Sequence, residues 1–219
     1  MHMMNRRKFS ALAAGAVAVA AFWPELLLAQ GKLPQDGVDY LTLEKRVNVD
    51  APAGKVEVIE FFWYSCPHCN AFEPKLEAWI RKLPSDVVMR RIPVGFRDEF
   101  VPQQRLYYAL EAMGKLDELH TKVFHAIHQD RLALNREDLI AAWIEKQGID
   151  PAKFRETYNS ITTSSKVRRA TQVQDAFKVD GVPAIGVQGR YYTDAALAGN
   201  MDRALQITDF LMAQVRKGS

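Results

Sequence analysis

Strand-like patterns occur in only two parts of this chain, and a long segment with helical periodicity separates them. The first part holds two apolar, β-favouring runs, at 56–64 and 87–94. The second part is 182–192, where the turn 188–190 predicts a hairpin. Apolar residues recur at helical spacing from Val101 to about Val179, whereas a crossover between parallel strands needs only about a dozen residues. We therefore predict an α/β sheet domain with an inserted helical subdomain.

Polar residues mark where several of the expected helices begin. Asn135 and Asp150 are predicted N-caps within the helical stretch, and Pro151 suits the first position of the helix that Asp150 starts. Asn200 is predicted to cap a helix that ends the chain. Each helix carries an apolar stripe that needs a packing partner.

The N-terminal residues have the composition of an export signal. The basic segment 5–8 precedes an Ala-rich apolar run at 9–22, which is too short for a membrane helix of about 20 residues. We expect residues 1–29 to be a signal peptide that is cleaved near Ala29. The adjacent Arg6 and Arg7 suit either the twin-arginine route or the general route, and both lead out of the cytoplasm.

The charge balance points to no polyanionic partner. The chain has 29 Lys+Arg against 26 Asp+Glu, and cleavage of the signal would remove three basic residues and one acidic residue. The remaining chain would be nearly neutral, so it would attract neither nucleic acid nor acidic lipid in bulk.

The only two cysteines, Cys66 and Cys69, stand in the motif Cys66-Pro67-His68-Cys69. The motif follows the first strand run, and Ser65 as N-cap with Pro67 in the first turn predicts that a helix begins there. A structural zinc site takes four ligands and would have to recruit His68, or two further histidines on a predicted helix, His125 and His128. A structural disulfide across so short a loop would restrict the unfolded chain only slightly.

A redox-active pair explains this spacing better than either alternative. At a helix N-terminus, Cys66 meets the positive end of the dipole and free amide groups, which favour its thiolate. His68 adds a donor in the same turn. Cys69, shielded by the helix and by Phe72, is expected to react only with the neighbouring sulfur. Stabilisation of the Cys66 thiolate would make the disulfide oxidising.

Glu60 is unusual because it places an acid inside an apolar strand run. A buried carboxyl is either paired, here with Arg90 or Arg91, or held with a raised pKa. Its aromatic neighbours are expected in the core: Phe61, Phe62 and Trp63.

Taken together, residues 60–69, the downstream Gly181-Val182-Pro183 and the helical block between them resemble the DsbA family of periplasmic thiol:disulfide oxidoreductases. The resemblance covers essentially the whole mature chain. It implies a thioredoxin-like fold formed by residues 30–97 and 180–219, with residues 98–179 as the inserted helical domain. The chain departs from familiar members at Ser65, because an aromatic residue often directly precedes the first cysteine.

The resemblance also implies roles for individual residues. Val182 and Pro183 would be joined by a cis peptide bond facing the disulfide, so that the Val182 backbone can pair with a client strand beside an apolar groove. Without the resemblance, a trans proline at the start of an edge strand would be the preferred interpretation. Glu60 would lie beneath the site and assist proton transfer at Cys69, the alternative being a purely structural ion pair.

The function implied is donation of the Cys66–Cys69 disulfide to newly exported proteins through a mixed disulfide. The expected clients are unfolded or partly folded proteins with free cysteines, and a DsbB-like membrane quinone oxidoreductase would reoxidise the enzyme. No cofactor or metal is expected, and the protein is expected to be a periplasmic monomer. Two rival functions remain open, a disulfide isomerase or reductase and a chaperone whose disulfide is incidental.

Overall fold

The computed structural model describes residues 33–218, which from Pro34 onward belong to one compact unit. The predicted signal peptide, residues 1–29, lies outside the described residues. Five strands form one mixed sheet in the order β1-β5-β4-β2-β3. The strands are β1 (Leu41–Thr42), β2 (Val56–Phe62), β3 (Val87–Pro93), β4 (Ala184–Val187) and β5 (Tyr191–Asp194).

The centre of the sheet is β2, which is buried along its whole length, as its apolar run predicts. It pairs in parallel with β3, to which α1 (Pro67–Ile80) connects it, and antiparallel with β4. The predicted hairpin is formed by β4 and β5. The two-residue edge strand β1 is exposed and was not predicted, because so short a polar segment has no recognisable periodicity.

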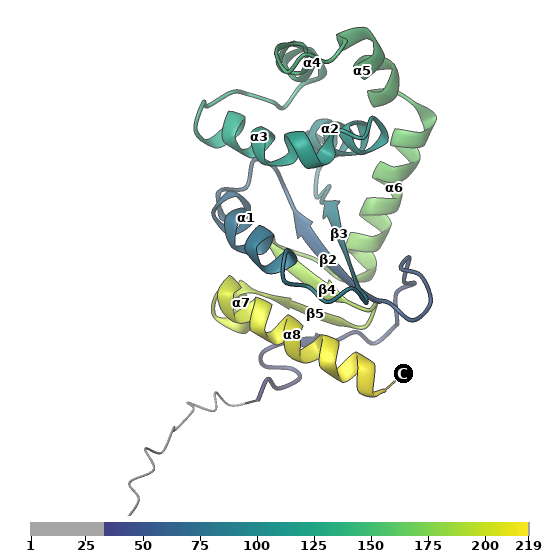
Figure 1. Cartoon of the computed structure of the whole chain (residues 1–219), viewed down its shortest axis with the longest axis vertical. Helices are drawn as coiled ribbons and strands as arrows, with labels where there is room; N and C mark the ends of the chain where they lie inside the picture. Colours follow the sequence, from purple (N-terminus) through teal and green to yellow (C-terminus); the bar gives the residue numbers. More distant parts are fainter. Residues whose placement is uncertain (1–32, 219) are drawn as a thin grey trace, which may run out of the picture. The chain divides into compact units, whose positions relative to one another are not determined.

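Five α-helices lie between β3 and β4 in the chain, which confirms the helical stretch. Figure 1 shows α2 to α5 gathered beyond one end of the sheet, while α6 runs back toward it. These helices, preceded by a short turn at Asp98–Phe100, are α2 (Val101–Ala112), α3 (Leu116–His128), α4 (Glu137–Lys146), α5 (Pro151–Tyr158) and α6 (Ile161–Ala176). No helix in the described part of the chain has the length and apolar character needed to cross a membrane.

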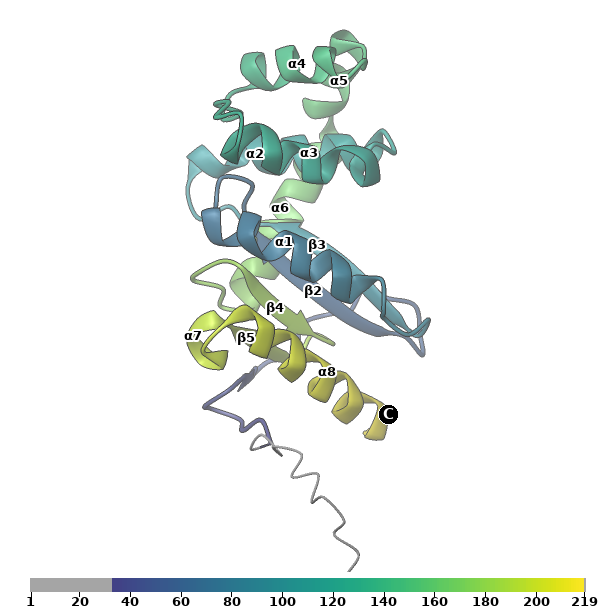
Figure 2. The same ribbon diagram turned by 60° about the vertical axis from the view of Figure 1, so that its left-hand side comes forward.

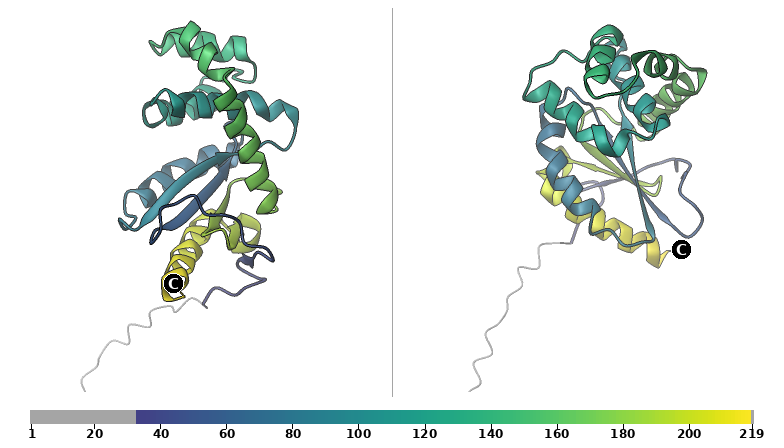
Figure 3. Two further views of the ribbon diagram at one scale, coloured as in Figure 1. Left: turned by 90° about the vertical axis from the view of Figure 1, so that its right-hand side faces the viewer. Right: turned by 45° about the horizontal axis from the view of Figure 1, so that its top comes forward.

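Helices cover both faces of the sheet. Val56 and Val58 of β2 pack in one core cluster with side chains of α1 and of α8 (Met201–Lys217), which follows the short α7 (Ala195–Ala198). Figure 2 shows α1 and α8 in front of the strands. Ile59 and Phe61 point to the opposite face, and the ring of Phe61 lies 5.2 Å from that of Phe177 at the end of α6. Figure 3 shows α6, in green, running along this side of the sheet. Alternation along one strand therefore decides which helices each side chain meets.

The helix starts test the predicted caps one by one. Asp150 and Asn200 are N-caps whose side chains accept backbone hydrogen bonds, as predicted. The prediction at Asn135 is wrong by one residue, since α4 begins after Arg136, which has extended backbone and makes no side-chain cap. The prediction at Ser65 is also wrong, because the sulfur of Cys66 takes the capping position of α1.

Candidate active site

The two thiols occupy the first turn of α1, where β2 gives way to the helix. Cys66 is the N-cap, with extended backbone at φ −79° and ψ 118°, and Pro67 begins the helix. The Cys66 sulfur accepts a hydrogen bond from the backbone N–H of Cys69 at 3.4 Å. Both cysteines are free thiols, and Pro67 and His68 are exposed beside them. The motif thus uses a thiol where a helix ordinarily places Ser, Thr, Asp or Asn.

The environment makes the two thiols chemically unequal. A hydrogen bond from the Cys69 thiol, helped by the N–H groups of Cys69 and His68 and by the charge of His68, lowers the pKa of Cys66 to about 6. Burial acts in the opposite sense at Cys69, which is fully inaccessible and whose pKa is raised far above the ordinary thiol value. The predicted burial of Cys69 is confirmed, although Phe72 belongs to the other core cluster. Cys66 is therefore the thiolate of the pair at neutral pH.

The segment just before β4, which contains Val182 and Pro183, lies against the Cys66 sulfur. The Val182–Pro183 peptide bond is cis, as the family resemblance implied. The carbonyl oxygen of Val182 lies 3.5 Å from the Cys66 sulfur and accepts a hydrogen bond from it when Cys66 is protonated. Two segments 116 residues apart in the sequence thus form one site.

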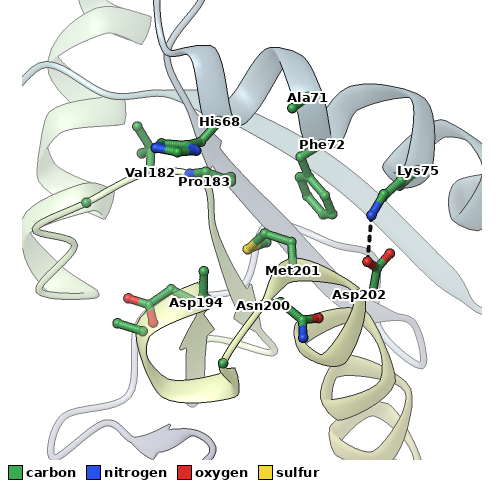
Figure 4. Close-up of a pocket in the computed structure, with 14 residues that line it drawn as sticks. His68, Ala71, Phe72, Lys75, Val182, Pro183, Asp194, Asn200, Met201 and Asp202 are labelled. Atoms are coloured by element: carbon green, nitrogen blue, oxygen red, sulfur yellow. Dashed lines mark hydrogen bonds and ion pairs between the residues drawn. The ribbon is translucent and has the colours of Figure 1, made fainter.

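An apolar cavity of about 500 Å³ opens beside the thiols. In Figure 4, His68 lies next to Val182 and Pro183, while the side chains of Phe72 and Met201 face each other across the opening. An ion pair between Lys75 of α1 and Asp202 of α8 borders it. The lining is mainly apolar with charges at the rim, which suits an extended peptide with apolar side chains.

Glu60 lies beneath the site and meets Arg91, one of its two predicted partners. In the parallel β2–β3 register Arg91 is directly opposite Glu60, so both side chains point to the same face, and Arg91 Nε donates to Glu60 Oε2 at 3.1 Å. Arg90 points to the other face and pairs with Glu57 and Asp50. Pairing and a raised pKa were predicted as alternatives, and Glu60 shows both. Burial raises the pKa of Glu60 by more than the charge of Arg91 lowers it, so the pKa is about 8.

Arg91 holds a cluster of carboxyl groups under the active-site helix. Its guanidinium donates to Glu73 at 3.1 Å and also to Glu77, both on α1. Burial opposes ionisation of Glu73, but His120, whose Nε2 lies 3.5 Å from Glu73 Oε1, and the Arg91 guanidinium lower its pKa. At neutral pH the charge therefore resides on Glu73, while Glu60 keeps its proton.

The proton held by Glu60 should affect how the free energy of unfolding depends on pH. With Cys66 and Cys69 linked, neither thiol titrates. Folded Glu60, with a pKa of about 8, then keeps a proton that the unfolded chain, with a value near 4.5, has lost. Because the folded state binds the extra proton in this window, the free energy of unfolding should fall as pH rises from about 5 to 8, by up to ~1.4 kcal/mol per pH unit. We expect Glu60→Gln to lack this component in urea unfolding at a series of pH values. A constant difference between the two proteins across the window would contradict it.

Several residues of the site are not predicted by the sequence analysis. Tyr64 directly follows the aromatic run, and its hydroxyl lies 2.9 Å from His120 Nδ1 of α3. Its carbonyl accepts a hydrogen bond from His128 Nε2 at 2.8 Å. Gln103 of α2 binds Ser65. Polar residues on the buried faces of otherwise apolar helices, such as Gln103 and His120, are the one signal that could have identified them.

The histidines named in the metal alternative have other contacts. His125 lies 3.3 Å from Asp130, and His128 binds the Tyr64 carbonyl. Within residues 33–218 no group of three or more His, Cys, Asp or Glu side chains is arranged to hold a metal ion.

Comparisons with known proteins agree on one family. Residues 57–206 match the model of the DSBA-like thioredoxin domain. The chain is 41% identical over 202 residues to the thiol:disulfide interchange protein DsbA of Bordetella parapertussis, a match that covers 92% of this chain and 96% of that protein. It is 39% identical over 191 residues to the DsbA of Burkholderia cepacia, covering 87% of this chain and 90% of the relative.

Solved structures give the same result. The crystal structure of Pseudomonas aeruginosa DsbA is 37% identical and superposes with a TM-score of 0.79, covering 83% of this chain and 94% of that one. The crystal structure of the oxidoreductase DsbA from Xylella fastidiosa is 32% identical with a TM-score of 0.79, covering 85% of this chain and all of that one (100%). The chain therefore belongs to the DsbA family and is a protein-disulfide oxidoreductase with a thioredoxin-like fold.

Proposed function

We propose that this protein donates its Cys66–Cys69 disulfide to exported proteins through a mixed disulfide. The observation that carries the proposal is the inequality of the two thiols. The Cys66 sulfur is stabilised as a thiolate at the start of α1, whereas Cys69 is buried and has a strongly raised pKa. A couple whose reduced form is stabilised in this way gives up its disulfide readily. The enzyme family supplies a second argument, because the named relatives are thiol:disulfide interchange proteins.

The reaction would proceed in two exchanges. In the first, a client thiolate attacks the Cys66 sulfur, the Cys66–Cys69 bond breaks, and the electron pair leaves on Cys69. Because Cys69 is buried, its sulfur needs a proton, and Glu60, which interacts electrostatically with Cys69, holds one near neutral pH. In the second exchange, the second thiolate of the same client attacks the client sulfur of the mixed disulfide, and Cys66 leaves as a thiolate without needing a proton.

The remaining site residues would tune and position these steps. Pro67 starts the helix that stabilises the thiolate, and His68 adds an N–H group and charge beside Cys66. The backbone of Val182, next to Pro183, would pair with the client strand, whose apolar side chains enter the adjoining cavity.

The proposal extends to the cellular location of the protein, its clients and its reoxidising partner. We place the mature protein in the periplasm, after cleavage near Ala29 and export by either route, where it would act as a monomer on unfolded or partly folded clients with free cysteines. A DsbB-like membrane quinone oxidoreductase would restore the disulfide, so no cofactor or metal is needed. We also assign residues 30–97 and 180–219 to the thioredoxin-like domain and residues 98–179 to the insert, an assignment supported by the position of α2 to α6 between β3 and β4.

The equilibrium of Cys66–Cys69 with a glutathione buffer tests the proposal. Trp63 lies beside the site, since its carbonyl accepts a hydrogen bond from the N–H of Cys66, so intrinsic fluorescence should follow the reaction. We expect the reduction potential of the Cys66–Cys69 couple to lie well above the thioredoxin value of about −270 mV. In the reduced protein, the Cys66 thiolate should form with a midpoint near pH 6. A potential at or below the thioredoxin value would instead favour a reductase or isomerase.

A further inference from the structure

The residue that precedes Cys66 is held by a single side chain from the inserted helices. Gln103 of α2, which is 2% exposed, accepts a hydrogen bond from the N–H of Ser65 at 3.2 Å. Its Nε2 donates to Ser65 Oγ at 2.7 Å and to the carbonyl of Leu134 at 3.0 Å. We call these three hydrogen bonds the Gln103 clamp. The clamp joins the active-site turn, α2 and the connection between α3 and α4.

The geometry fixes how the Gln103 amide is oriented. The N–H of Ser65 can only donate and the carbonyl of Leu134 can only accept, so the amide oxygen must face Ser65 and the amide nitrogen must face Leu134. Both N–H groups of the amide and its oxygen are thereby used. In a buried site such a fully satisfied group has one favoured position, because any displacement leaves a polar atom without a partner.

The clamp acts one residue away from the reactive sulfur. The N–H of Cys66 donates to the carbonyl of Trp63, and its sulfur accepts from the N–H of Cys69 at 3.4 Å. That N–H···S distance depends on how the backbone enters α1, and Ser65 is the residue immediately before the Cys66 N-cap. Tyr64, one residue further back, is also held from the insert, by His128 of α3. The approach to Cys66 is therefore fixed by side chains of the helical segment.

We propose that Gln103 is a positioning residue for Cys66, and that through the clamp on Ser65 the inserted helices set the stability of the Cys66 thiolate. The inference deepens the proposed function, on which it rests, because it concerns the same sulfur. It gives the helical segment a part in the redox chemistry in addition to any contact with clients.

A matched pair of variants separates positioning from general stability. Gln104 follows Gln103 on the same helix and is equally buried, but its amide donates to the carbonyl of Pro93 at the end of β3. Gln103→Leu and Gln104→Leu should both weaken the fold, since each leaves a buried backbone group without a partner. Only Gln103→Leu should raise the pH midpoint of Cys66 thiolate formation. It should also change the equilibrium constant with glutathione by about tenfold in favour of the disulfide form. The equilibrium constant of the Gln104→Leu protein should stay within about twofold of the wild-type value.

A smaller change gives a second test in case Gln103→Leu folds poorly. Ser65→Ala removes one of the three hydrogen bonds and keeps the amide, so it should shift both properties in the same direction but less. In the Gln103→Leu background it should add nothing further. An unchanged thiolate midpoint and glutathione equilibrium in Ser65→Ala and in folded Gln103→Leu would overturn the inference.

The two proposals fail in different ways. A wild-type potential at or below that of thioredoxin would contradict the proposed donation of disulfides, yet a change in the thiolate midpoint of Gln103→Leu would still support positioning. Conversely, an oxidising wild-type protein with an unaltered midpoint in the variants would support the function and contradict the clamp's role.

Discussion

Replacement of Cys66 by serine is expected to abolish oxidation of a reduced client protein. The client thiolate attacks the Cys66 sulfur, and a serine hydroxyl can neither form the disulfide nor leave as a stabilised anion. The expected loss is complete within detection, measured as the rate at which a reduced two-cysteine client gains its disulfide. Retained client oxidation in the purified variant would contradict the mechanism.

Cys69→Ser is the matched control for this experiment. It keeps the accessible sulfur, which has the lowered pKa, and removes the buried one. The Cys66 thiolate of this variant can still attack the client sulfur of a disulfide between glutathione and a one-cysteine client, and glutathione leaves as a thiolate. Because neither Cys69 nor a second client thiol can then displace the bound partner, a covalent complex should accumulate on non-reducing gels. The double variant Cys66→Ser, Cys69→Ser distinguishes a chaperone, because undiminished function in cells would then favour binding over redox chemistry.

Arg91→Met is expected to destabilise the protein more than any exchange at an exposed ion pair. The Arg91 guanidinium is the cation between Glu60, Glu73 and Glu77, and the side chain of Glu73 is only 3% exposed. Removing one partner of a buried pair leaves an uncompensated charge, which costs about 3–5 kcal/mol. Urea unfolding at pH 7 should show a loss of this order.

The direction in which the stability of Arg91→Met changes with pH shows whether the unpaired Glu73 charge causes the loss. Without Arg91, the folded-state pKa of Glu73 should rise above its unfolded value, so the variant should be relatively most stable in acid and lose stability as pH rises. Arg216→Met, which breaks the exposed pair with Asp86, is the control and should change stability little at any pH. Equal losses in the two variants, or a loss that grows in acid, would contradict this account.

The patterns that repeat along the chain made most of the fold predictable. The apolar run of β2, the helical spacing of α2 to α6 and the turn between β4 and β5 each follow from local periodicity. The choice between Arg90 and Arg91 did not follow, because it depends on the register between two strands. Once Glu60 and Arg91 are known to be opposite each other, strand alternation settles it.

The site was predictable where chemistry is carried by a motif and not where it depends on contacts between distant segments. Cys66 and Cys69 are recognisable from their spacing, and the burial that separates their pKa values follows from the position of Cys69 one turn into α1. Gln103 was missed because its partners, Ser65 and Leu134, are 38 and 31 residues away. Ser65 was assigned as the cap because the sequence does not show that a sulfur can take that place.

The order in which the sheet is assembled has a consequence during synthesis. The strands on either side of β2 come from opposite sides of the helical segment, and Val182 is 116 residues downstream of Cys66. Synthesis proceeds from the N-terminus, so both thiols are made before the segment around Val182 that lies against Cys66. Contacts of such long sequence separation also form late in folding. A nascent molecule therefore passes through an interval in which its own cysteines are open to unintended partners, and the interval ends only when β4 docks beside β2.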